Sequence, residues 1–112
     1  MSVERWPVRW AGKTVVVDFP AEIDVNNAGP IRALLMSLVE ESGAQVVIVD
    51  MAATTFCDSA GVTALATAHR KAAAQGAEVK VIAATAPVLR IFELTGLDQV
   101  LSVFGSMAAA LS

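Results

Sequence analysis

The side chains of this sequence that could do chemistry gather in one short segment, Phe-Cys-Asp-Ser-Ala-Gly at residues 56–61. The segment lies between a β-branched apolar run, typical of a buried strand, and a run with helical spacing. We therefore expect Ser59 at a helix N-terminus, on a loop outside the sheet, where its hydroxyl is accessible. Unpaired N–H groups and the helix dipole favour an anion at such a position, so Ser59 is a candidate site for a phosphate.

Asp58 and Ser59 also have a simpler interpretation, as caps of that helix. Both residue types are preferred at the N-cap, where the side chain stabilises the helix by about 1 kcal/mol. Local physics alone favours this capping role for Ser59 over a role as phosphoacceptor. For the neighbouring Cys57 a structural role is also favoured, that of a small buried apolar residue rather than a reactive thiol.

Nucleophilic catalysis requires partners that this sequence does not supply. The Gly-x-Ser-x-Gly motif of serine hydrolases is only half present, because Cys57 stands at the first glycine position. His69 lies further along the same predicted helix, about 15 Å from Ser59 at the usual helical rise, which is too far for a base. One cysteine and one histidine cannot form a usual zinc site, and no glycine-rich nucleotide-binding motif occurs. We expect no catalytic residue, no metal site, no cofactor and no enzymatic activity.

Composition limits the class of protein further. The chain has 112 residues, 55% of them hydrophobic, with a net charge of −3. This length suits one domain, residues 1–112, and the acidic balance argues against nucleic acid as a partner. No apolar run approaches the roughly 18 residues of a membrane span, and from the composition of residues 1–5 we expect no signal peptide. The lone cysteine suits a reducing compartment, so we expect a cytoplasmic domain with no direct membrane insertion.

The elements that must position Ser59 alternate between strands and helices. Residues 8–10 and 14–19 predict an antiparallel hairpin around Gly12, and Pro20 ends its second strand. Residues 21–27 are interpreted as a connector, with Asn27 as the N-cap of a helix that Gly43 closes. Further strands are expected at residues 45–50, 79–83 and 100–104. Further helices are expected at residues 59–74, closed by Gly76, at residues 86–97, and through residue 111 after a Ser106 cap.

This order of elements predicts an α/β fold. Strand–helix–strand units imply parallel pairing with right-handed crossovers, and the opening hairpin adds an antiparallel pair. The run at residues 45–50 lacks alternation, as expected for a strand that is covered on both faces. We expect one mixed sheet of about four to five strands, with the β-hairpin at its N-terminal end and about four helices around it.

Several segments together resemble the STAS domain, and among STAS domains the bacterial anti-sigma factor antagonists. Residues 56–62, followed by Ala-His-Arg-Lys-Ala at 68–72, are similar to the core motif of that family. Residues 21–24 resemble its Gly-Glu-Leu/Ile-Asp segment, and residues 46–50 its central strand. Residues 86–97 resemble its Ser-Pro-x-Val-x-Arg/Lys-x-Leu/Phe-x-x-x-Gly-Leu stretch. The resemblance extends over roughly residues 8–111 and implies the STAS fold.

The resemblance also implies a function. Antagonists of this family bind an anti-sigma factor that is a serine kinase, and so release a sigma factor. The kinase phosphorylates a serine that matches Ser59, and a metal-dependent serine phosphatase removes the phosphate. Asp58 matches the family's aspartate beside the phosphoacceptor, and Asp24 matches a position on the neighbouring loop. The partner-binding residues implied by position are Asp24, Asn26, Asp58, Ser59, Ala60 and Gly61.

Two other functions remain open. Some STAS domains are accessory subunits of membrane lipid-transport complexes, and these can carry Asp-Thr/Ser-Ala-Gly, which the segment from Asp58 to Gly61 matches through Ala60. In that case the second helix docks on an ATPase subunit and Ser59 is a cap. Alternatively, the chain is a STAS binding module that holds its partner without being phosphorylated.

Overall fold

The computed structural model describes residues 6–112, so the expectation for residues 1–5 lies outside its described part. The main sheet has five strands in the order β1-β2-β4-β6-β7, and a small second sheet pairs β3 with β5. The strands are β1 (Val8–Ala11), β2 (Thr14–Asp18), β3 (Glu22–Ile23), β4 (Val46–Met51), β5 (Phe56–Cys57), β6 (Glu78–Ala83) and β7 (Ser102–Phe104). The helices are α1 (Ala28–Glu40), α2 (Ser59–Ala74), α3 (Ala86–Thr95), the 3₁₀ turn η1 (Leu97–Gln99) and α4 (Met107–Leu111).

Pairing within the main sheet confirms the predicted α/β fold. β1 and β2 form the antiparallel hairpin, and β2–β4, β4–β6 and β6–β7 are parallel pairs. The central strand β4 is buried on both faces, as its continuous apolar run predicts. Parallel strands place their carboxyl ends at one edge of the sheet, so the chain leaves β2 and β4 at the same edge.

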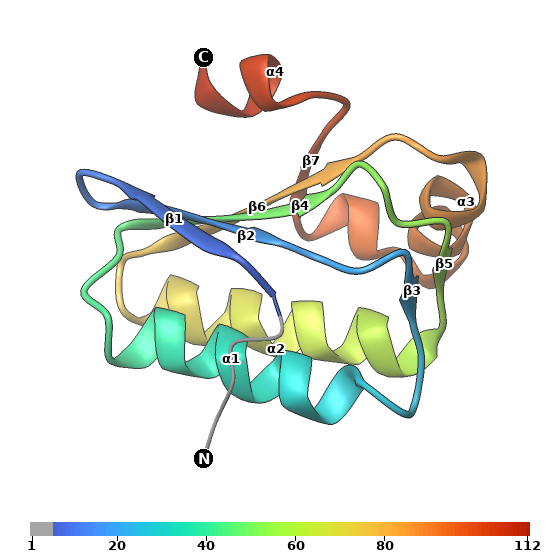
Figure 1. Ribbon diagram of the computed structural model, residues 1–112, viewed down its shortest axis with the longest axis horizontal. Helices are drawn as coiled ribbons and strands as arrows, with labels where there is room; N and C mark the ends of the chain where they lie inside the picture. Colours follow the sequence, from blue (N-terminus) through green and yellow to red (C-terminus); the bar gives the residue numbers. More distant parts are fainter. Residues whose placement is uncertain (1–5) are drawn as a thin grey trace.

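The two faces of the sheet are covered unequally (Figure 1). Helices α1, α2 and α3 lie against one face, and the main core forms there from residues such as Val17, Leu65 and Phe92. The short helix α4 packs on the opposite face, where Ala110 completes a smaller cluster around Ile48. Most of the apolar surface that this fold buries therefore lies on the side of the three longer helices.

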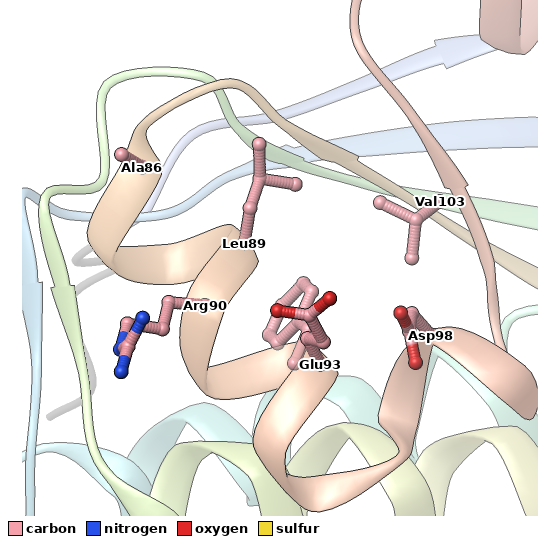
Figure 2. Close-up of a pocket in the computed structure, with 7 residues that line it drawn as sticks. Ala86, Leu89, Arg90, Glu93, Asp98 and Val103 are labelled. Atoms are coloured by element: carbon pink, nitrogen blue, oxygen red, sulfur yellow. The ribbon is translucent and has the colours of Figure 1, made fainter.

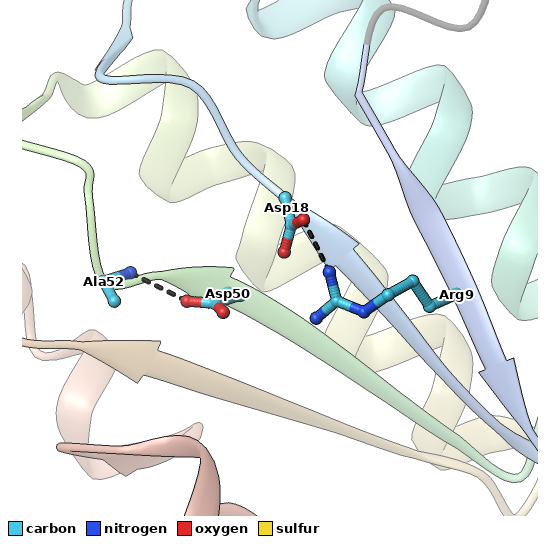
Figure 3. A network of polar contacts seen from close by, with 4 residues as sticks. All are labelled: Arg9, Asp18, Asp50 and Ala52. Atoms are coloured by element: carbon cyan, nitrogen blue, oxygen red, sulfur yellow. Dashed lines mark hydrogen bonds and ion pairs between the residues drawn. The ribbon is translucent and has the colours of Figure 1, made fainter.

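Polar contacts occur on the face of the main sheet against which α4 packs (Figure 3). Arg9 on β1 pairs with Asp18 on β2, with 2.7 Å between Nη1 and Oδ2. Asp50 is the register partner of Asp18 on β4, and its Oδ1 accepts a hydrogen bond from the Ala52 N–H at 2.9 Å. These two carboxylates therefore have roles within the fold, one in the hairpin and one in the turn after β4.

The small sheet of β3 and β5 differs from the expectation that residues 21–27 are only a connector. It continues the pairing of β2 with β4 beyond Pro20, which has no N–H to donate. The Thr55 N–H donates to the Ala21 carbonyl at 2.8 Å, and the buried Thr54 hydroxyl donates to the Pro20 carbonyl at 2.8 Å. Strands of two residues show no readable alternation, which is why the sequence does not predict them.

The ends of the helices follow the predicted signals with two exceptions, the N-cap of α1 and the end of α3. α3 ends at Thr95 instead of residue 97, because Gly96 adopts left-handed backbone with φ of +78°. Gly43 and Gly76 adopt left-handed backbone just beyond α1 and α2, with φ of +80° and +75°, as predicted for closing glycines. Asn27 occupies the N-cap position of α1, but its side chain makes no cap hydrogen bond. Its Oδ1 accepts from the Asp24 N–H at 3.0 Å, and its Nδ2 donates to the Glu22 carbonyl at 2.9 Å. Asn27 therefore ties the loop to β3 instead of capping α1.

Candidate functional site

The site around Ser59 is built on the small sheet. β3 and β5 are parallel, with Ile23 opposite Cys57, and both of these side chains are buried. The pairing extends one step further, because the Asp58 N–H donates to the Ile23 carbonyl at 3.1 Å. Asp24 and Asp58 therefore leave the same end of the small sheet side by side. The structure thus brings together the two loops that the family resemblance implies are neighbours.

Asp58 is the N-cap of α2, so the interpretation of Ser59 as the cap is wrong. Asp58 has extended backbone, and its Oδ1 accepts from the Ala60 N–H at 2.9 Å and from the Gly61 N–H at 3.3 Å. These bonds satisfy two of the N–H groups that a helix leaves open in its first turn. Ala60 is partly exposed next to this cap.

The Ser59 side chain is exposed at the first position of α2. Within residues 6–112, no hydrogen bond engages its hydroxyl. Its carbonyl accepts from the Thr63 hydroxyl at 2.9 Å, so the backbone is fixed while the side chain is free. An exposed hydroxyl on a fixed backbone can receive a group that an enzyme transfers to it.

The loop after β3 is fixed by its own side chains. Asp24 Oδ1 accepts from the Asn26 N–H at 2.8 Å, an arrangement typical of a tight polar turn. Asn26 is exposed, and Val25 is 77% exposed, whereas Asp24 is half-buried. Asp24 and Asp58 thus accept hydrogen bonds from the backbone of their own loops. The nearby Asn26 and Ser59 are exposed to the solvent.

Gly61 is buried beneath the site. A Cβ at this position would lie 2.6 Å from the Cys57 Sγ and 2.8 Å from the Ile23 Cγ2. The first turn of α2 therefore packs directly onto the small sheet, which a residue without a side chain permits. Two of the residues implied for partner binding therefore differ in exposure. Gly61 is buried and positions the loop, whereas Ser59 is exposed and accessible to a partner.

Cys57 lies under the same turn and is 5% exposed. Burial, and secondly the nearby Asp58 carboxylate, raise the pKa of the Cys57 thiol from 9.0 to about 11. A thiol with this pKa is protonated at neutral pH and is a poor nucleophile. The geometry therefore supports the interpretation of Cys57 as an apolar packing residue.

The described part of the chain brings neither His69 nor a metal-binding cluster to Ser59. His69 lies on α2 well along the helix from Ser59, at the roughly 15 Å that helical rise implies. No three His, Cys, Asp or Glu side chains in residues 6–112 come together in a way that could hold a metal ion. Over the same residues, none of the helices has the length and apolar character needed to cross a membrane.

Two hollows flank α3, and neither is predicted by the sequence. One, of about 390 Å³, lies on the side of β7, where Glu93, Asp98 and Val103 line it (Figure 2). The other, of about 230 Å³, lies between α3 and β5 and is lined in part by Phe56 and Leu94. Both depend on how α3 is set against strands that are distant in the chain, and no local pattern encodes that.

Comparison with known proteins agrees with this geometry. Residues 5–110 match the STAS domain family. The structure is similar to an anti-sigma factor antagonist from Mycobacterium paratuberculosis, with a TM-score of 0.85 and 25% identity over 95% of this chain and 89% of that one. A proposed anti-sigma factor antagonist from Thermotoga maritima gives a TM-score of 0.85 at 15% identity over 95% of this chain and 91% of that one.

A further similar structure is the antagonist SpoIIAA, a Bacillus cell fate determinant, in its unphosphorylated form. Its TM-score is 0.81 at 20% identity, over 95% of this chain and 92% of that one. The family match covers nearly the whole chain, and the solved structures share the arrangement of sheet and helices described above. The chain belongs to the STAS domain family, and its structure resembles those of anti-sigma factor antagonists.

Proposed function

We propose that this chain is an anti-sigma factor antagonist that is switched off by phosphorylation of Ser59. In this role it binds an anti-sigma factor with serine kinase activity in the cytoplasm, and so releases a sigma factor. The phosphorylated chain no longer binds, and a metal-dependent serine phosphatase restores it. The chain itself catalyses nothing, because ATP and the metal ion belong to its partners.

The observation that carries this proposal is the free hydroxyl of Ser59. It is exposed at the first position of α2, and Asp58 takes the capping role that would otherwise occupy it. Asp24 and Asn26 lie on the adjacent loop, so a partner that covers Ser59 also meets these side chains. The similarity to solved antagonists supports the same assignment.

The effect of a phosphate on Ser59 follows from its surroundings. Phosphorylation adds about −1.5 to −2 charges beside Asp58. The N–H groups of Ala60 and Gly61 already bond to the Asp58 carboxylate, so the phosphate would have to compete with it for them. A close-fitting partner would also have to desolvate the phosphate, which is costly. Partner binding is therefore lost, while the core beneath the site remains folded.

A kinase assay tests the proposal. The purified chain is incubated with ATP and, in turn, with each anti-sigma factor kinase of its genome of origin, and the product is mapped by mass spectrometry. We expect one phosphate, on Ser59, and none on the Ser59→Ala variant. Ser37→Ala, which removes an exposed hydroxyl from α1, is the matched control and is phosphorylated like the wild type. If no kinase modifies Ser59, the proposal is contradicted.

One observation favours a second function, that of an accessory subunit of a membrane lipid-transport complex. Ala60 gives the motif the form Asp-Ser-Ala-Gly, which such subunits can share. In that role α2 docks on an ATPase subunit and Ser59 stays unmodified. A stable complex with a purified transporter ATPase subunit, together with an unmodified Ser59, would support it. Binding of an anti-sigma factor without phosphorylation would instead identify a STAS binding module that is not switched at Ser59.

A further inference from the structure

A hollow of about 230 Å³ opens between β5 and α3, beside the Ser59 loop. It is lined by Phe56 and Cys57 of β5 and by Pro87, Arg90, Ile91 and Leu94 of α3. Phe56 and Leu94 are 49% and 68% exposed, although both side chains are large and apolar. We refer to this hollow as the β5–α3 groove.

The β5–α3 groove is continuous with the surface that carries Ser59. Its β5 wall leads directly through Asp58 into Ser59. On the adjacent loop after β3, Val25 is 77% exposed. Three exposed large apolar side chains, Val25, Phe56 and Leu94, thus lie at the end of the molecule that carries Ser59, whereas Trp10 and Leu111 line a separate hollow on the α4 side. An apolar patch beside an exposed hydroxyl is a candidate site of protein interaction.

Arg90 gives the groove a positive charge. Arg90 lines both hollows beside α3, and Figure 2 shows its guanidinium on the side of α3 that faces β5, apart from the Glu93 and Asp98 carboxylates. In the described residues it forms no ion pair. A guanidinium beside apolar walls is complementary to a carboxylate that lies next to an apolar side chain. The groove therefore fits a protein segment with that combination of side chains.

We propose that the β5–α3 groove is where the anti-sigma factor anchors to this chain, an inference that rests on the function proposed above. The groove takes an apolar side chain of the anti-sigma factor, and Arg90 pairs with a carboxylate beside it. The same partner covers Ser59, because the groove and Ser59 share one surface. A phosphate on Ser59 then brings a second negative charge into a contact to which the partner already contributes a carboxylate.

The test measures binding of the full chain to the anti-sigma factor kinase that phosphorylates Ser59, by isothermal titration calorimetry. Leu94→Lys puts a charge into the groove, and we expect the Kd to rise about tenfold or more. Leu111→Lys is the matched control, because Leu111 is 62% exposed and lines a separate hollow of about 410 Å³ between α4 and the β1–β2 hairpin, so the comparison distinguishes the two apolar surfaces. Arg90→Gln is expected to raise the Kd roughly threefold, and Arg70→Gln, near the other end of α2, leaves it unchanged.

Circular dichroism establishes that each variant is folded, and sedimentation of the free wild type reports self-association. If Leu94→Lys binds as tightly as Leu111→Lys while Ser59 is still phosphorylated, the groove is not the anchor and the proposed function stands. If no anti-sigma factor binds or phosphorylates the wild type, the proposed function fails and the inference fails with it. A wild-type dimer that Leu94→Lys dissociates would overturn the inference by assigning the groove to a second copy of this chain.

Discussion

At the scale of single residues, the neighbouring side chains Asp58 and Ser59 have different roles at the N-terminus of α2. Asp58 bonds the open N–H groups of α2, and this leaves the Ser59 hydroxyl exposed and unengaged in the described structure. Either residue type can cap a helix, so the side chains alone do not separate the two roles. The separation comes from backbone conformation, which is extended at Asp58 and helical from Ser59 onward.

Gly61 offers a matched test of the packing under the site. Gly61→Ala places a Cβ within 2.8 Å of two side chains, and we expect a loss of about 1–3 kcal/mol in the free energy of unfolding. Gly29→Ala makes the same change in the first turn of α1, where nothing lies within 4 Å, and should stabilise by about 0.5–1 kcal/mol. Urea unfolding of both variants measures the difference. Equal effects at the two positions would contradict the close contact of α2 with the small sheet.

The raised pKa of Cys57 predicts how stability changes with pH. Because the folded state holds the thiol protonated up to about pH 11, its contribution to stability is complete below pH 9 and is lost as pH rises from 9 to about 11. The difference in unfolding free energy between wild type and Cys57→Ala should therefore shrink across this range, by about 3 kcal/mol at most. Unfolding curves measured from pH 7 to pH 11 test this. A difference that stays constant with pH would show that the thiol is not held protonated by the fold.

At the scale of elements, α2 depends on its cap. Asp58→Ala removes the acceptor for two N–H groups, so we expect a loss of about 1 kcal/mol in the free energy of unfolding. Asp58→Asn keeps a side-chain oxygen in the same place and should retain most of that energy. Thermal unfolding followed by circular dichroism compares them. An Asp58→Ala variant as stable as Asp58→Asn would mean that the cap contributes nothing.

Elements differ in how far their sequence predicts them. The run from Val46 to Val49 is continuously apolar and β-branched, and it forms the first part of the central strand β4 as predicted. The small sheet is not predicted from the sequence, because each of its strands has only two residues. The register of Ile23 with Cys57 also depends on pairing between segments that are distant in the chain. The motif at residues 56–61 could therefore be recognised, but the geometry that aligns it with Asp24 could not.

At the scale of the whole molecule, both sides of the sheet share the same strands. β4 contributes Val47 to the main core and Ile48 to the cluster under α4, so the two cores meet within one strand. We therefore predict that the chain is a single domain that unfolds in one cooperative step. Urea transitions followed by near- and far-ultraviolet circular dichroism should coincide. Two separated transitions would contradict a single cooperative unit.

The features that we propose for partner binding lie at one end of the molecule. Ser59, the loop with Asp24 and Asn26, and the β5–α3 groove lie together there, whereas α4 covers the opposite face of the sheet. Sequence resemblance predicted the residues of the motif, but the groove depends on how α3 sits against β5. The proposed switch uses this arrangement, because a charge added at Ser59 acts on the whole contact surface without entering the core.

The most direct measurement compares the Kd of an anti-sigma factor kinase for the unmodified chain and for the chain phosphorylated on Ser59. We predict that phosphorylation raises the Kd by about a hundredfold or more while the melting temperature changes by no more than about 2 °C, because the charge lies outside the core. Ser59→Asp should weaken binding in the same direction. Equal affinity of the kinase for both forms of the chain would contradict the switch.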